Sequence, residues 1–167
     1  GKVSDPLLTI DNLTLGYDDT QILTGVSVSL HPGDRIGLLG KNGAGKSTFL
    51  KGLTGALTPR TGDRVAGAHL RIGYFDQQQL EVLDLDASPL LHLQRLTPTA
   101  REQTILDFLG GFNFKGDQAR EAIRLFSGGE KARLALAMVV WQDPNVLILD
   151  EPTHHLDLDM RYALAMA

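Results

Sequence analysis

The amino-acid sequence predicts an α/β fold, in which antiparallel strands precede a strand–loop–helix core and a small helical part. Three observations lead to this class. Apolar and polar residues alternate over the first thirty residues, a glycine-rich stretch separates a short apolar run from a helical pattern, and a continuous apolar run, Val146 to Leu149, ends in two carboxylates. At 167 residues the chain has the usual length of one domain.

The composition excludes several classes of protein. The chain has 20 acidic and 16 basic side chains, 43% hydrophobic residues and no cysteine. These values exclude disordered and collagen-like chains, disulfides, thiol catalysis and cysteine-ligated zinc, and the mild acidity argues against a broad basic surface for nucleic acid. No apolar run approaches the ~20 residues that a membrane span needs. The 18 glycines exceed average usage, so several are expected where backbone geometry or a close approach requires them.

Residues 1–34 are predicted to form antiparallel strands, because Leu13 and Leu15, and later Val26, Val28 and Leu30, alternate with polar residues. Residues 35–83 are expected to form the core, with a strand at its start, a helix from about residue 46 and another strand over 70–74.

Residues 84–126 are expected to be helices and loops. Ser88-Pro89 is typical of a helix start, and Thr99 to Glu102 is a capping-box pattern before a helix that ends at Gly110-Gly111. A further short helix is expected over 117–123. Residues 127–167 then hold a longer helix, the buried strand and the segment after it.

The glycine-rich stretch matches the pattern G-x-x-x-x-G-K-[ST]. Successive backbone N–H groups in such a loop converge on phosphate oxygens, and the following helix adds the positive end of its dipole. Lys46 is then expected to reach the β- and γ-phosphates and Ser47 to ligate Mg²⁺. The alternative is an ordinary glycine-rich turn. The pattern arises by chance in about one chain in a hundred. The predicted binding residues are Gly40, Asn42, Gly43, Ala44, Gly45, Lys46, Ser47 and Thr48.

Asp150 and Glu151 end the apolar strand, where ligands of open α/β sheets bind. Asp150 is predicted to hold Mg²⁺, and Glu151 to polarise the attacking water as the catalytic carboxylate. The alternative is a pair of solvated carboxylates closing a strand.

Ser127-Gly128-Gly129-Glu130 has two interpretations that the residues leave open. Ser127 and Glu130 form a capping box, which marks a helix start. The two glycines at a helix N-terminus also suit a second anion-binding surface for a γ-phosphate.

The order of these motifs resembles an ATP-binding cassette (ABC) ATPase domain over nearly the whole chain. The resemblance implies a P-loop NTPase core with an N-terminal antiparallel β subdomain and a small helical signature subdomain, together forming one nucleotide-binding domain that is C-terminally incomplete. It further implies that Tyr17 stacks on adenine, and that Gln77 is catalytic and joins the Mg²⁺ and water network. The motif at Ser127 becomes the signature that closes over ATP held by a second cassette.

The segment Leu149 to Asp157 is similar to the L-D-E-P-T-N-H-L-D of the ABC-F class, with His154 where asparagine is usual. The chain looks most like the second cassette of a bacterial ABC-F protein. The class implies ATP and Mg²⁺ as cofactors, a second cassette as partner, action on the ribosome with its rRNA and tRNA, a cytoplasmic location and no membrane contact.

The chain departs from the family at its end. Cassettes complete their active site with a histidine beyond the catalytic glutamate, but only sixteen residues follow Glu151, and those from Asp159 on include no histidine. The resemblance therefore implies a cassette cut after the Leu156-Asp157 segment, with weak hydrolysis by this chain alone. Two alternatives remain: the ATPase subunit of a membrane transporter, and a module that binds nucleotide without turnover.

Overall fold

The computed structural model describes residues 5–38 and 44–150, and of Arg35–Leu38, Ala44, Lys46, Ser47 and Asp150 it describes the backbone alone. The described residues divide into two compact units. The strand unit comprises the residues up to Ile72 together with Pro144–Leu149, and the helical unit comprises Gly73–Asp143 with Asp150. No described helix is long and apolar enough to cross a membrane.

The strand unit contains an antiparallel sheet of three strands in the order β2-β1-β4. Its strands are β1 (Leu8–Tyr17), β2 (Thr20–Leu30) and β4 (Thr61–Ala66). β1 and β2 form a hairpin whose last pair is Tyr17 with Thr20, and Asp18 in the turn has a φ of 48°. Alternate β1 residues, including Leu13 and Leu15, are buried, as expected of a sheet with one face on a core.

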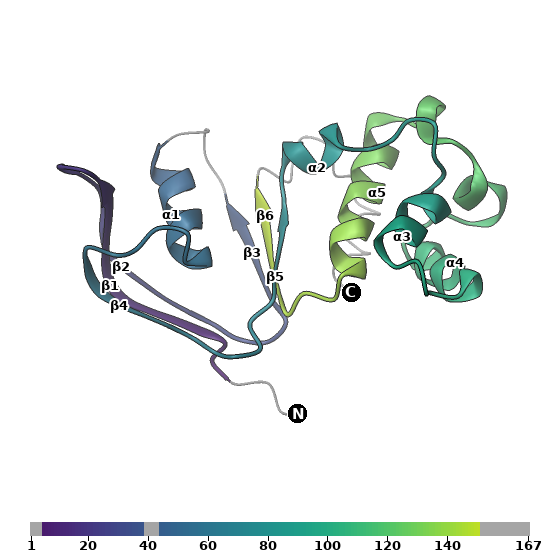
Figure 1. Ribbon diagram of the computed structural model, residues 1–167. Coiled ribbons are helices and arrows are strands. Elements are labelled where there is room, and N and C mark those ends of the chain that lie inside the picture. Colours follow the sequence, from purple (N-terminus) through teal and green to yellow (C-terminus); the bar gives the residue numbers. More distant parts are fainter. Residues whose placement is uncertain (1–4, 39–43, 151–167) are drawn as a thin grey trace. The chain divides into compact units, whose positions relative to one another are not determined.

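The helix α1 (Ala44–Thr54) packs against β1 and β2 (Figure 1). Gly52 permits this close approach, because an added Cβ would lie 2.6 Å from Cδ1 of Leu15. From the edge strand β4, the Arg64 guanidinium donates two hydrogen bonds to the carbonyl of Leu53, at 3.2 and 2.8 Å. The sheet and the helix are thereby fixed to one another near both ends of β1.

A second sheet has the strand order β3-β6-β5, with β3 (Asp34–Leu38), β6 (Val146–Asp150) and β5 (Ile72–Phe75). Residues Val146 to Leu149 are all buried, as predicted for a strand covered on both faces. Asn145 precedes β6 and joins it to the segment before β5, because its amide accepts from Arg71 N at 2.7 Å and donates to the His69 carbonyl at 2.6 Å.

The helical unit holds α2 (Gln77–Glu81), α3 (Pro89–Leu96), α4 (Glu102–Gly111), the short 3₁₀ helices η1 (Gly116–Arg120) and η2 (Ile123–Leu125), and α5 (Gly128–Trp141). α3 contacts α4, α5 and η1, and α2 packs on α5 (Figure 1). Ser88 caps α3 by accepting from Leu91 N at 3.0 Å. Fully buried leucine, isoleucine and alanine side chains from α3, α4 and α5 form its core.

Two sequence expectations need correction, and one strand was not expected. The capping box from Thr99 is wrong: α4 begins only at Glu102, and Arg101 precedes it without a side-chain cap, since Thr99 lies in a turn closed by Ala100 N on the Thr97 carbonyl. The helix expected over 117–123 is two separate 3₁₀ helices. The strand β4 had no expectation in the sequence.

Candidate functional site

The Tyr17 side chain lies against the middle and last turn of α1, at Thr48 and Lys51. Its pKa is lowered, first by hydrogen bonding with the side chain of Thr48 and further by Lys51. The Lys51 ammonium lies over the Tyr17 ring, 5.4 Å from the ring centroid. Thr48 is fully buried, whereas the Tyr17 side chain stays 39% exposed. The structure thus brings two predicted binding residues, Tyr17 and Thr48, together with Lys51; we call these three residues the Tyr17 cluster.

The N-terminus of α1 fits an anion. The helix begins at Ala44, so the predicted Gly45, Lys46 and Ser47 lie in its first turn, and no acidic residue accompanies them there. The helix dipole therefore presents uncompensated positive potential at this end. A Cβ at Gly45 would meet only Leu23 Cδ2, at 3.9 Å, among the described atoms. Packing within the described residues therefore does not demand glycine here, whereas close approach of a phosphate does.

Gln77 is the first residue of α2, separated from the end of β5 by Asp76 alone, and its side chain is exposed. Asp76 caps this helix by accepting from Gln78 N at 2.8 Å, and Gln79 returns a contact by accepting from Asp76 N at 2.6 Å. Gln79 is thus engaged in the cap. Of the three consecutive glutamines, Gln77 is the one at the strand end that the family pattern selects.

Ser127 and Glu130 form the predicted capping box at the start of α5. Ser127 Oγ accepts from Glu130 N at 3.1 Å, and Glu130 Oε1 accepts from Ser127 N at 2.9 Å. This backbone bond to Ser127 is the main cause of the lowered pKa of Glu130, and Gln118 and Arg133 lower it further. The helix-start interpretation is therefore confirmed. The second interpretation, an anion-binding surface, stays a prediction. Ser127 and Gly128 are exposed at this helix end.

Aromatic and cationic side chains that the sequence did not single out pack beneath this motif. The rings of Phe114 and Phe126 are stacked, with centroids 6.0 Å apart and an interplanar angle of 11°. Arg133 lies over the Phe114 ring at 5.2 Å and is 92% buried, and its Nε has no described hydrogen-bond partner. Gln118 of η1 donates to Glu130. The segment before α5 is thus held to its first turn.

The remaining predicted residues are not placed. Gly40, Asn42, Gly43, Glu151 and His154 to Asp157 lie outside the described residues. Asp150 ends β6, but its side chain is not described. Within the described ranges, no group of three histidine or acidic side chains is arranged to hold a metal ion. Mg²⁺ ligation by Ser47, Gln77 and Asp150 stays a prediction.

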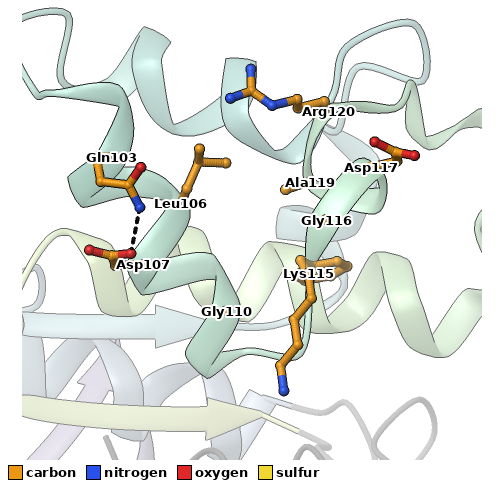
Figure 2. A pocket seen from close by; sticks show the side chains of 10 residues that line it. Gln103, Leu106, Asp107, Gly110, Lys115, Gly116, Asp117, Ala119 and Arg120 are labelled. Atoms are coloured by element: carbon orange, nitrogen blue, oxygen red, sulfur yellow. Dashed lines mark hydrogen bonds between the residues drawn. The ribbon is translucent and has the colours of Figure 1, made fainter.

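A pocket of about 490 Å³ lies in the helical unit, between α4 and η1 (Figure 2). Its polar lining is mixed in charge, with Asp107, Asp117, Lys115 and Arg120. Two of the charged groups are already paired: Asp107 accepts from Gln103 at 2.8 Å, and Arg120 pairs with Glu102. None of the predicted site residues lines this pocket.

Comparisons with known proteins agree with the motifs. The family model described as "ABC transporter" matches residues 23–154. "Probable ATP-binding protein YheS" of Escherichia coli O6:H1 is 56% identical over 166 residues, which are 99% of this chain and 26% of that protein. "ATP-binding cassette sub-family F member 3" of Mus musculus is 42% identical over 99% of this chain and 24% of its own length. A solved "Structure of ATP binding subunit of ABC transporter" has a TM-score of 0.69 at 26% identity, covering 96% of this chain and 72% of that one.

The chain spans about a quarter of the length of the curated relatives that it matches. The family match covers most of the chain, from within β2 through the signature and the buried strand. The solved relatives share the α/β fold that the sequence predicts. The chain therefore belongs to the ABC family of ATP-binding cassettes, and within it to the ABC-F class.

Proposed function

We propose that this ATP-binding cassette hydrolyses ATP as one of two cassettes of an ABC-F protein that acts on the cytoplasmic ribosome in translation. The observation that carries the proposal is the high identity to YheS together with that to mammalian sub-family F members. Residues 1–167 then form one nucleotide-binding domain, with parts 1–34, 35–83, 84–126 and 127–167.

The site roles follow the family motifs. Tyr17 stacks on the base, the loop from Gly40 to Thr48 binds the phosphates, and Glu151 with Gln77 activates water. The position of Tyr17 against Thr48 supports the first two roles, because it puts a partly exposed aromatic ring beside the helix of the phosphate loop. Mg²⁺ would be held by Ser47, Gln77 and Asp150 and would neutralise charge on the phosphates.

The signature is proposed to close over ATP held by a second cassette. The exposure of Ser127 and Gly128 supports this role.

The ATPase proposal is tested by steady-state phosphate release from the purified chain and from its Glu151→Gln variant, with ATP binding measured on both by calorimetry. We expect both to bind ATP and the wild type to release phosphate faster. If both bind ATP and both are equally inactive, the chain is a nucleotide-binding module without turnover, and the catalytic role of Glu151 in this chain is wrong.

The ribosomal role is tested by cosedimentation with ribosomes of a protein that contains this cassette and a second one. We expect ATP to increase the bound fraction, and Glu151→Gln to increase it further by blocking release. Recovery in the membrane fraction with no ribosome enrichment would instead favour the transporter alternative.

A further inference from the structure

The backbone of Tyr17 is fixed by the hairpin, but its ring is not. Tyr17 pairs with Thr20 in the last rung of β1 and β2. The side chain leaves the sheet at the hairpin turn, where it is 39% exposed. An exposed side chain with two free torsions populates several rotamers. An aromatic ring used as a stacking platform therefore needs further contacts to hold one orientation.

Those contacts come from one face of α1. Thr48 and Lys51 are three residues apart, so they project from the same side of the helix. Thr48 hydrogen-bonds with the side chain of Tyr17, and the Lys51 ammonium lies 5.4 Å from the centre of its ring. This distance is within the range of a cation–π interaction. Lys51 takes part in none of the ion pairs between described residues, so no carboxylate there competes with the ring.

We propose that Lys51 is a positioning residue for the nucleotide base: its ammonium holds the Tyr17 ring in the orientation that stacks on a purine. The proposal rests on the proposed function, in which Tyr17 stacks on the base of ATP. Its consequence is that α1 controls both ends of the nucleotide, with its first turn at the phosphates and its last turn setting the base platform.

A purely structural role for Lys51 makes different predictions. Lys51 lies in the last turn of α1, where a cation stabilises a helix through the dipole. If that were its role, removing the charge would lower the stability of the chain and leave base recognition unchanged. The two roles are separated by a ligand that has the phosphates but lacks the base.

The experiment measures dissociation constants of ATP and of inorganic tripolyphosphate for the 167-residue chain by calorimetry. The variants are Lys51→Gln, Lys51→Arg, Tyr17→Leu and the double variant Tyr17→Leu/Lys51→Gln, with Arg60→Gln as a control that removes an exposed cation from the same unit. Far-UV circular dichroism verifies that each variant is folded; glutamine is a good helix former, so α1 is expected to persist.

We expect Lys51→Gln to weaken ATP binding by about two- to fivefold, the range of an exposed cation–π contact, and to leave tripolyphosphate binding unchanged. Lys51→Arg is expected to restore ATP affinity, because a guanidinium also stacks on an aromatic ring. In the Tyr17→Leu background, Lys51→Gln is expected to have no further effect, because the two residues act as a unit.

An independent readout is the titration of Tyr17 by absorbance, taken as the difference from Tyr17→Phe. Lys51 lowers the pKa of Tyr17, so Lys51→Gln is expected to raise that pKa, whereas Arg60→Gln leaves it unchanged.

Two results with the Lys51→Gln variant overturn the proposal: unchanged ATP affinity, or an equal loss for ATP and tripolyphosphate. The latter would place Lys51 at the phosphates. If the wild-type chain binds tripolyphosphate but gains nothing from the base, base stacking on Tyr17 is wrong and the proposal falls with it. If it binds neither ligand, ATP binding by this chain fails, which is a distinct result.

Discussion

Gly16 is the residue at which a single methyl group tests the hairpin geometry that carries Tyr17. A Cβ at Gly16 would lie 2.1 Å from the Thr20 carbonyl oxygen and 2.9 Å from Gln21 Cα, whereas real Cβ contacts essentially never fall below 3.0 Å. Gly16→Ala therefore forces the β2 backbone to retreat by about 0.9 Å. The opposing atoms belong to the backbone, which cannot rotate away as a side chain can. Overpacking of this kind costs about 1–3 kcal/mol, and we expect the upper part of that range.

The assay is urea unfolding monitored by far-UV circular dichroism. It gives the free energy of unfolding of each variant, and the slope of that free energy against urea concentration is compared between variants. Gly110→Ala is the matched control, because a Cβ there meets no described atom within 4 Å and alanine favours a helix by about 0.5–1 kcal/mol. We also expect Gly16→Ala to weaken ATP binding several-fold under folding conditions, since Tyr17 is the next residue. Equal stability of the two alanine variants would refute the reasoning, as would wild-type ATP affinity in Gly16→Ala.

Three further predictions concern the capping box of α5 and the hydrogen bonds of Asn145. Ser127→Ala is expected to lower the free energy of unfolding by about 1 kcal/mol through loss of the α5 cap, seen as a lower urea midpoint. The folded-state pKa of Glu130 is lowered from 4.5. The Glu130 carboxylate therefore stabilises the folded state fully above pH 4.5, and this stabilisation is lost as the pH falls through the lowered pKa. The urea midpoint should therefore fall less between pH 7 and pH 3 in Glu130→Gln than in the wild type, and an equal fall in both would contradict this role. Asn145→Ala removes two hydrogen bonds and is expected to cost about 2 kcal/mol by the same measurement; a change below the error of the urea midpoint would contradict it.

Local patterns in the sequence predicted the parts of the fold that local interactions determine. The capping box of Ser127 with Glu130 spans one helical turn, and the structure confirms it because both bonds close within that turn. The same kind of pattern at Thr99 failed: Thr99 lies in a turn closed by Ala100 N on the Thr97 carbonyl, and α4 begins only at Glu102. A capping pattern therefore marks a helix start only where its residues do not belong to a neighbouring turn.

Tertiary contacts determine the rest, and single-sequence periodicity contains little of that information. β4 has the sequence Thr-Gly-Asp-Arg-Val-Ala and becomes a strand through pairing with β1, about fifty residues earlier. Lys51 contacts Tyr17 from 34 residues further along the chain. The only available signal for Lys51 was its spacing of three residues from Thr48. The glycine excess predicted that some glycines permit close approaches, but not which ones. Gly52 is one of them, because α1 lies close to Leu15 there.

Trp141 gives the chain a built-in spectroscopic probe. It is the single tryptophan of the sequence, its Nε1 donates to Thr97 Oγ1 at 2.9 Å, and its ring meets Phe108 edge-on with centroids 5.0 Å apart. All three residues belong to the helical unit, so tryptophan emission monitors the packing of that unit, whereas circular dichroism records both. Two unfolding curves from one unmodified sample, one for each signal, will coincide if the units unfold together and will separate if one melts first.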